Sequence, residues 1–208
     1  MFTTPRLVAI ALCAALNFAI GNVVYLVKLP IYLDSIGTIL CALLIFPDRL
    51  AALCCAFIAG LIGIILTGLV LNPFLPWFAG SVLVIALISA LLTARASDTF
   101  RARPLQPLPF FGKVILCGVV TGVGSAIVSA PVVAYLFGGV TGSGSAFVVA
   151  FFLKAGEQLL SSAMLASLAI DPLDKVLQVL LAALLYRATP REFIAMLRVP
   201  QASAPRAG

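Results

Sequence analysis

Long apolar runs, separated by short segments that contain proline, glycine or charged residues, recur along the whole chain. A run of about 18 or more apolar residues can cross the hydrocarbon core of a bilayer as a helix. The pattern predicts helices over residues 7–27, 34–46, 50–71, 76–93, 110–137 and 172–186. We therefore expect an all-α integral membrane protein with one polytopic domain at residues 1–198, followed by a disordered cytoplasmic tail at residues 199–208.

The ends of the predicted helices coincide with residues that start or stop a helix. Pro30 ends the first helix, because proline has no N–H to donate. Asp34 is a good N-cap for the second helix, where a carboxylate also complements the helix dipole. Asn72 and Pro73 end the third helix, and Pro131 predicts a kink in the fifth.

The segment at residues 146–170 is long enough to cross a membrane but carries Lys154, Gly156, Glu157 and Gln158 in its middle. If it crossed fully, the arginine-bearing C-terminal segment would lie outside, against the tendency of Lys- and Arg-rich loops to stay in the cytoplasm. We therefore expect six full crossings, with 146–170 as an extra re-entrant or surface-lying helical segment broken near Gly156. A seventh full span is the alternative, because the charge rule has exceptions.

The composition excludes a soluble domain, since 63% of the residues are hydrophobic and only 10% are charged. The formal net charge is +6, and the basic residues concentrate in residues 95–113 and 187–206. Short basic loops stay on the cytoplasmic side, so the positions of these Lys and Arg residues predict that both termini are cytoplasmic. Basic nucleic-acid grooves interleave aromatic residues, which these segments largely lack. We therefore expect the lipid bilayer, and no nucleic acid, as a partner.

The residue types of common active sites and metal centres are sparse in this chain. It has no His, and its five cysteines lie within apolar runs without CxxC or Cys/His spacing. Asp171 and Asp174 stand at the start of the predicted last helix, where acidic residues complement the dipole. The alternative is that Asp174 and Lys175 pair with charges on other segments. We expect no enzyme, and no catalytic residue, metal or cofactor.

A binding site is better supported, because polar side chains gather toward the ends of the helices that are predicted to lie outside. Such side chains are costly at membrane depth and usually face a cavity or a partner. Each also has a simpler explanation, such as helix capping for Asp34 and Asn72, an interfacial position for Trp77, or a mutual ion pair for Lys154 and Glu157. The candidate substrate-binding residues are Asn22, Lys28, Asp34, Asn72, Trp77, Lys154, Glu157 and Gln158.

The first helix carries small residues at four-residue spacing, namely Ala11, Ala15 and Ala19. Residues at this spacing lie near one helix face, so another helix can approach closely in a membrane. The stripe is a candidate docking face for a partner. Packing within the chain itself is the alternative, because the sequence is rich in alanine.

Several features, in this order and spacing, resemble the substrate-binding S components of energy-coupling-factor (ECF) transporters over about residues 6–192. The features are the Ala11, Ala15 and Ala19 stripe, the segment 29–38 around Asp34, the glycine-rich link 138–145, and Asp171 to Lys175 followed by an apolar helix and Arg187. The resemblance implies a six-helix bundle that binds a vitamin or related small metabolite near the outer face. Loops after the first, third and fifth helices would cover the pocket.

The resemblance also implies partners and a location. Ala11, Ala15 and Ala19 would dock on a transmembrane coupling protein driven by two cytoplasmic ATPase subunits, in the bacterial plasma (inner) membrane. Asn72 and Trp77 would belong to the second covering loop, and Lys154, Glu157 and Gln158 to a third covering region longer than is usual in that family. A membrane sensor domain and a structural membrane subunit without transport activity are the alternative functions.

Overall fold

The computed structural model describes residues 2–102 and 104–198, which are predominantly helical with no strand among them, so the all-α prediction is confirmed for this part of the chain. The tail expected at residues 199–208 lies outside the described residues. Two 3₁₀ helices, η1 (Leu75–Phe78) and η3 (Ala94–Ala96), and a π-helical turn, η2 (Ser89–Thr93), flank α4 and join it to α5. The α-helices are α1 (Thr4–Val27), α2 (Ile36–Ile45), α3 (Arg49–Val70), α4 (Ala79–Ile88), α5 (Ser97–Arg101), α6 (Pro107–Tyr135), α7 (Ser145–Lys154), α8 (Leu159–Ala188) and α9 (Arg191–Leu197).

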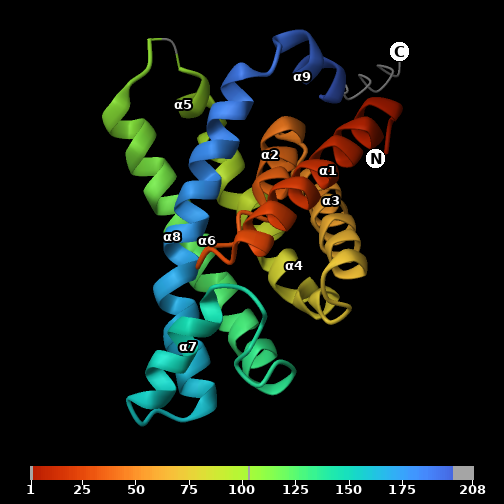
Figure 1. The fold of residues 1–208 in the computed structure, drawn as a ribbon. Coiled ribbons are helices and arrows are strands. Elements are labelled where there is room, and N and C mark those ends of the chain that lie inside the picture. Colours follow the sequence, from red (N-terminus) through yellow and green to blue (C-terminus); the bar gives the residue numbers. More distant parts are fainter. Residues whose placement is uncertain (1, 103, 199–208) are drawn as a thin grey trace, which may run out of the picture.

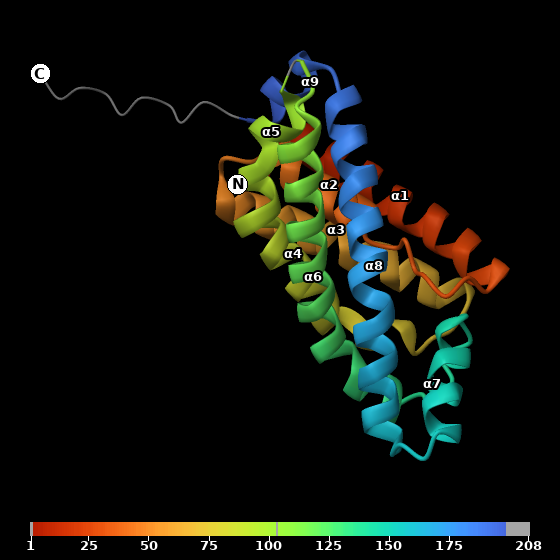
Figure 2. The ribbon, with the colours of Figure 1, turned by 90° about the vertical axis from the view of Figure 1, so that its left-hand side faces the viewer.

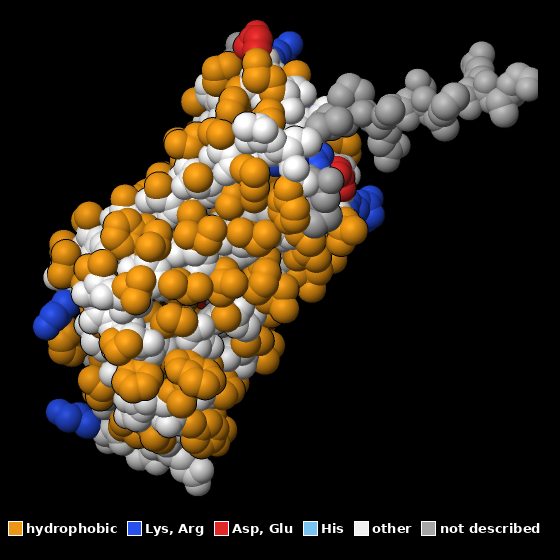
Figure 3. Space-filling view, turned by 90° about the vertical axis from the view of Figure 1, so that its right-hand side faces the viewer, with side chains coloured by type: hydrophobic (Ala, Val, Ile, Leu, Met, Phe, Trp, Pro, Cys, Tyr) orange, Lys and Arg blue, Asp and Glu red, His pale blue; other side chains and the backbone are white. Residues whose placement is uncertain are grey.

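Four helical segments of the described chain are long and apolar enough to cross a membrane: α1, α3, the continuous rod at Leu75–Arg101, and α6. The 30-residue α8 is as long as α6 but carries Asp171, Asp174 and Lys175 in its middle. The side chains that face outward from the bundle are largely apolar, as expected for contact with lipid. Figure 3 shows hydrophobic side chains over most of one face, with Lys and Arg side chains near its edges.

The two longest helices, α6 and α8, run side by side over most of their length (Figures 1 and 2) and form the most extensive helix pair. Each is roughly 45 Å long at 1.5 Å per residue. Close approach is possible because Gly118 and Gly122 of α6 face the backbone of α8, where a Cβ atom would overlap Val176 or Pro172. This GxxxG spacing is typical of helix pairs in membranes.

The short helix α2 lies at the centre of the molecule, packed between α1, α3 and α8. Its residues are buried almost without exception. The side chain of Asn17 in α1 holds α2, because its Oδ1 accepts from Gly37 N at 2.7 Å and its Nδ2 donates to Thr38 Oγ1 at 2.9 Å. With 10 residues, α2 is too short to cross a bilayer alone.

Two predicted helix boundaries are wrong. The last helix begins at Leu159, not at Pro172, so Pro172 lies inside α8 and the predicted separate segment 146–170 is divided between α7 and α8. A proline inside a helix is tolerated where neighbouring helices cover the freed backbone, and α6 packs there. The N-cap of α2 is Ser35, one residue after Asp34. The break near Gly156 is confirmed: Gly156 has φ of +96°, which separates α7 from α8.

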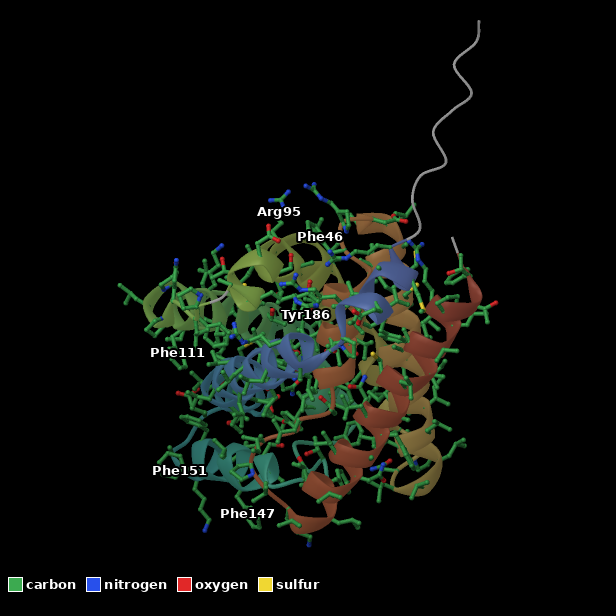
Figure 4. All side chains as sticks on the ribbon, turned by 90° about the horizontal axis from the view of Figure 1, so that it is seen from above. Phe46, Arg95, Phe111, Phe147, Phe151 and Tyr186 are labelled. Atoms are coloured by element: carbon green, nitrogen blue, oxygen red, sulfur yellow. The ribbon has the colours of Figure 1, made fainter. Side chains whose placement is uncertain are left out.

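The helices α5 and α9 and the start of α1 lie at the same end of the molecule (Figure 1), where several charged side chains join them. There Arg6 pairs with Asp48 at 3.2 Å, and Arg187 donates to the carbonyl oxygens of Phe100 and Ala102 at 3.0 and 2.9 Å. Viewed from above, Tyr186 lies among the helices while Arg95 points away from them (Figure 4).

Candidate functional site

A cavity lies between α1, α3, α4, α6 and α8, under the loop that joins α1 to α2. Its empty space, including the part that opens to the surroundings, is about 980 Å³. Apolar side chains such as Val24, Ile64 and Val82 line it together with hydroxyl groups and the charged residues Asp34 and Lys175. An apolar cavity with a few convergent polar groups is the usual form of a small-molecule site.

The carboxylate of Asp174, in the middle of α8, is fully buried beside this cavity and holds the α1–α2 loop. Its Oδ1 accepts from the backbone N–H groups of Tyr32 and Leu33 at 3.0 and 3.1 Å. Its Oδ2 accepts from Lys175 Nζ at 2.7 Å and from Gln178 Nε2 at 2.8 Å. Because both oxygens are fully used, Asp174 is a fixing point of the fold and has no acceptor left for a ligand.

The α1–α2 loop has an unusual backbone that this fixing point supports. Leu33 has φ of +50°, a left-handed conformation that bulky residues rarely adopt. Its N–H donates to Asp174, and two residues later the N–H of Ser35 donates to Gln178 Oε1 at 3.1 Å. The two α8 side chains therefore hold the loop in a conformation that its own residues do not favour.

The ammonium group of Lys175 is also buried, with its side chain only 3% exposed, and it joins α8 to the same loop. Besides the 2.7 Å ion pair with Asp174, its Nζ lies 3.7 Å from Asp34 Oδ1. It also lies 5.9 Å from the centre of the Tyr32 ring, within the range of a cation–π contact. The alternative interpretation, in which Asp174 and Lys175 pair with charges on other segments, is therefore correct for Lys175, whereas Asp174 has its ion pair with Lys175 itself.

A second carboxylate, that of Asp171, lies one helical turn before Lys175 and lines the cavity. Asp171 is 3% exposed, and its Oδ2 accepts from Ser129 Oγ of α6 at 3.3 Å. Within residues 2–102 and 104–198, Asp171 has no ion pair with a Lys or Arg. It therefore differs from Asp174, whose charge is matched by Lys175.

Hydroxyl groups from α4 and α6 complete the polar part of the cavity wall. Ser81 of α4 is 6% exposed, and its Oγ has no hydrogen-bond partner in the described part of the chain. Ser125 of α6 also lines the cavity and is buried. A buried hydroxyl without a partner is costly, so Ser81 has an unused donor and acceptor for a bound molecule.

Three connecting segments contribute residues to the cavity wall. They are the α1–α2 loop with Tyr32 and Asp34, the segment after α3 with Leu75 and Phe78, and the link after α6 with Thr141. The link also packs on α1, because Tyr25 Oη donates to the carbonyl oxygen of Thr141 at 3.0 Å. Glycines allow this close packing, since a Cβ at residue 142 would overlap the Tyr25 hydroxyl.

One of the eight candidate binding residues, Asp34, lines the cavity. Its side chain is 43% exposed, so it remains open to a ligand although it pairs with Lys175. Asn22 lies on α1 outside the lining, where its Nδ2 donates to the carbonyl oxygen of Phe18 at 2.6 Å. Lys28 is exposed at the C-terminus of α1, in a left-handed conformation with φ of +56°.

The other five candidates lie on exposed or half-buried parts of the connecting segments. Asn72 Oδ1 accepts from Phe74 N at 3.0 Å, which closes the turn after α3, and Trp77 is 63% exposed. The three residues Lys154, Glu157 and Gln158 surround the α7–α8 turn and are exposed there. None of these five residues lines the cavity. Near Asn72 and Trp77, it is Leu75 and Phe78 that line it.

The charged cluster of α8 is the part of the site that the candidate binding residues chosen from the sequence did not include. Asp171, Asp174, Lys175 and Gln178 follow the i, i+3, i+4, i+7 spacing of one helix face. This spacing inside an otherwise apolar stretch is a signal of a functional face in a membrane protein. The boundary expected at Pro172 obscured it, because the two carboxylates were interpreted as the helix start.

The alanine stripe of α1 faces outward. Ala11, Ala15 and Ala19 are exposed, whereas Cys13 and Ala14 on the other side of the helix are buried. The stripe is therefore not used for packing within the described chain, which was the alternative explanation.

Neither a metal-binding cluster among the described residues nor a known relative identifies the ligand of this site. Among the described residues, no group of three or more His, Cys, Asp or Glu could hold a metal ion. Asp34, Asp171 and Lys175 instead present separate charges to one cavity. Comparison with protein-family models, with curated proteins and with solved structures finds no match.

Proposed function

We propose that this chain is a solute-binding membrane protein similar to the S components of ECF transporters, which takes up a vitamin or related small metabolite. The observation that carries the proposal is the cavity in which Asp34, Asp171 and Lys175 meet beneath the α1–α2 loop. Buried charges are costly in a membrane protein and are usually retained for function. A purely structural subunit would not need the buried carboxylate of Asp171, which forms no ion pair within the described part of the chain.

The covering segments support the same proposal. Segments after α1, α3 and α6 all line the cavity, in the places where the resemblance implies covering loops. The basic end of the molecule holds both described ends of the chain, consistent with cytoplasmic termini in a bacterial inner membrane. The cavity mouth would then lie toward the outside.

The outward-facing alanine stripe supports a partner. Ala11, Ala15 and Ala19 are exposed on a helix long enough to cross the membrane, so a second transmembrane helix can approach α1 closely there. We propose that a transmembrane coupling protein, driven by two cytoplasmic ATPase subunits, docks on this face.

The test of the proposed function is mass spectrometry of the small molecules that co-purify with the detergent-extracted protein, followed by thermal unfolding with each identified molecule and with a vitamin panel. We expect a bound metabolite that raises the melting temperature, because ligands of the folded state stabilise it. An empty protein without any shift would contradict solute binding and favour a sensor domain or a structural subunit.

Replacing Ala15 with Phe is expected to abolish uptake of the co-purifying solute by cells while leaving its affinity for the isolated protein unchanged. The large ring would hold a partner helix away from α1, whereas the cavity lies on the opposite side of that helix. Uptake of labelled solute and isothermal titration calorimetry measure the two effects. The matched control is Ala169→Phe, at an exposed alanine of α8. Loss of both uptake and binding in the Ala15 variant alone would contradict the docking face.

A further inference from the structure

We infer that the cavity takes a positively charged organic solute, such as a small amine or a quaternary ammonium compound, in contact with Asp34 and Asp171. This inference rests on the proposed function and names the chemical class of its substrate. Asp34, Asp171 and Lys175 line the cavity, and Asp174 lies directly behind Lys175. Three carboxylates therefore lie around one ammonium group, which forms ion pairs with Asp34 and Asp174.

The ammonium group of Lys175 already forms ion pairs within the chain. Lys175 Nζ lies 2.7 Å from Asp174 and 3.7 Å from Asp34, so its stronger partner is the carboxylate outside the cavity. Asp171, 3% exposed, is left with one hydroxyl donor, Ser129 at 3.3 Å. Burial of a charge is costly unless an opposite charge is close. A cationic ligand supplies that charge, while an anionic ligand would increase the imbalance.

No other cation of the described chain compensates. The described cavity lining contains no Arg and no second Lys. Of the neighbouring cations, Lys28 is exposed at the end of α1 and Lys154 is exposed at the end of α7. Arg6 pairs with Asp48 at the opposite end of α1.

The remaining cavity wall fits an organic cation rather than a bare ion. Ser81 lines the cavity and is 6% exposed as a residue, and its buried hydroxyl oxygen has no hydrogen-bond partner among the described residues. It can bind a polar group of the ligand at a distance from the charge. The rings of Tyr25, Tyr32 and Phe78 line the same space, and aromatic faces attract ammonium groups. The site therefore offers two carboxylates, a free hydroxyl and aromatic surface.

A single cysteine in the cavity can measure this charge preference without knowledge of the natural ligand. We would make Ser81→Cys, which removes no hydrogen bond present in the described structure. Cys54, which is less buried than the other four cysteines, is changed to Ser in the same chain. The dialysed, detergent-solubilised protein is then treated with 2-(trimethylammonio)ethyl and 2-sulfonatoethyl methanethiosulfonate, one cationic and one anionic reagent. Mass spectrometry follows both modification rates, and Val140→Cys, 70% exposed in the link after α6, provides the reference ratio.

The expected result is a cation-to-anion rate ratio at residue 81 at least about tenfold above that at residue 140, equal to about 1.4 kcal/mol. A ratio equal to the reference, or one that favours the sulfonate, would overturn the cationic substrate class while leaving solute binding possible. If neither reagent modifies residue 81 although both modify residue 140, a solute does not reach Ser81 and the ligand site inferred here is overturned, while the co-purification experiment decides the proposed function separately.

A second set of variants tests whether the two named carboxylates cause the preference. Asp171→Asn and Asp34→Asn, each made in the Ser81→Cys chain, should lower the rate ratio several-fold because each removes one negative charge from the wall. The matched control is Asp98→Asn, at an exposed residue of α5 outside the cavity lining, and should leave the ratio unchanged. Equal ratios in all three variants would overturn the assignment of the cation site to Asp34 and Asp171.

Discussion

Replacing Asp174 with Ala is expected to lower the free energy of unfolding by about 3–5 kcal/mol, as for other buried ion pairs that lose one partner. The variant removes the closest ion-pair partner of the buried Lys175 ammonium group, which keeps only the longer 3.7 Å contact with Asp34. It also leaves the backbone N–H groups of Tyr32 and Leu33 without their acceptor. Each such buried donor adds about 1–3 kcal/mol when it cannot reach water.

Equilibrium unfolding in mixed micelles, followed by circular dichroism, measures this change. Asp98→Ala is the matched control, because Asp98 is exposed on α5, and should alter stability by less than about 0.5 kcal/mol. Limited proteolysis adds a local readout, since the α1–α2 loop should become cleavable near residues 28–35. A variant that unfolds with the same midpoint as the native protein, with the loop still protected, would show that Asp174 does not hold the loop.

Replacing Gly122 with Ala is expected to destabilise the α6–α8 pair by about 1–3 kcal/mol, the usual range for overpacking. The added Cβ would overlap the backbone of Pro172, and a backbone atom inside a helix cannot rotate away as a side chain end can. The two helices must therefore move apart along their most extensive contact. The same shift would displace Asp171, which precedes Pro172, from Ser129.

The matched control for this prediction lies on the same helix. A Cβ added at Gly112 of α6 would meet no atom within 4 Å, so Gly112→Ala should be neutral or stabilise by up to about 1 kcal/mol through helix propensity. The measurement is again unfolding in mixed micelles, with both variants compared with the native protein. If Gly112→Ala and Gly122→Ala lowered the free energy of unfolding by the same amount, the close α6–α8 contact at Gly122 would not be the cause.

Local sequence pattern predicted most helices within a few residues of their observed ends. The first and third were expected at 7–27 and 50–71, and the structure has Thr4–Val27 and Arg49–Val70. Apolar runs and turn residues act over a few positions, so they are visible without the fold. The exception is α8, where Pro172 is a local stop signal that tertiary packing overrides.

The candidate site was harder to predict from the local sequence pattern than the helices were. Asp34 was recognised as a polar residue at membrane depth, and it lines the cavity. Its partner Lys175 lies 141 positions later in the chain, on a helix whose start was wrongly placed. Lys154, Glu157 and Gln158 are polar residues of the same general kind, but they are exposed beside the α7–α8 turn. Their type alone could not separate them from the residues that meet in the cavity.

By itself, the sequence determined that the chain is helical, that several helices can cross a membrane, and that α1 carries a stripe of small residues, because composition and periodicity are local properties. Only the tertiary structure decided which charges face each other. The contacts of Asp174 with Tyr32 and Leu33 span 142 and 141 positions and exist only because α8 packs against the α1–α2 loop. Close packing of α6 on α8 at Gly118 and Gly122 fixes the position of the α8 segment next to Asp171 and Asp174. The site therefore follows from helix packing, which no single segment encodes.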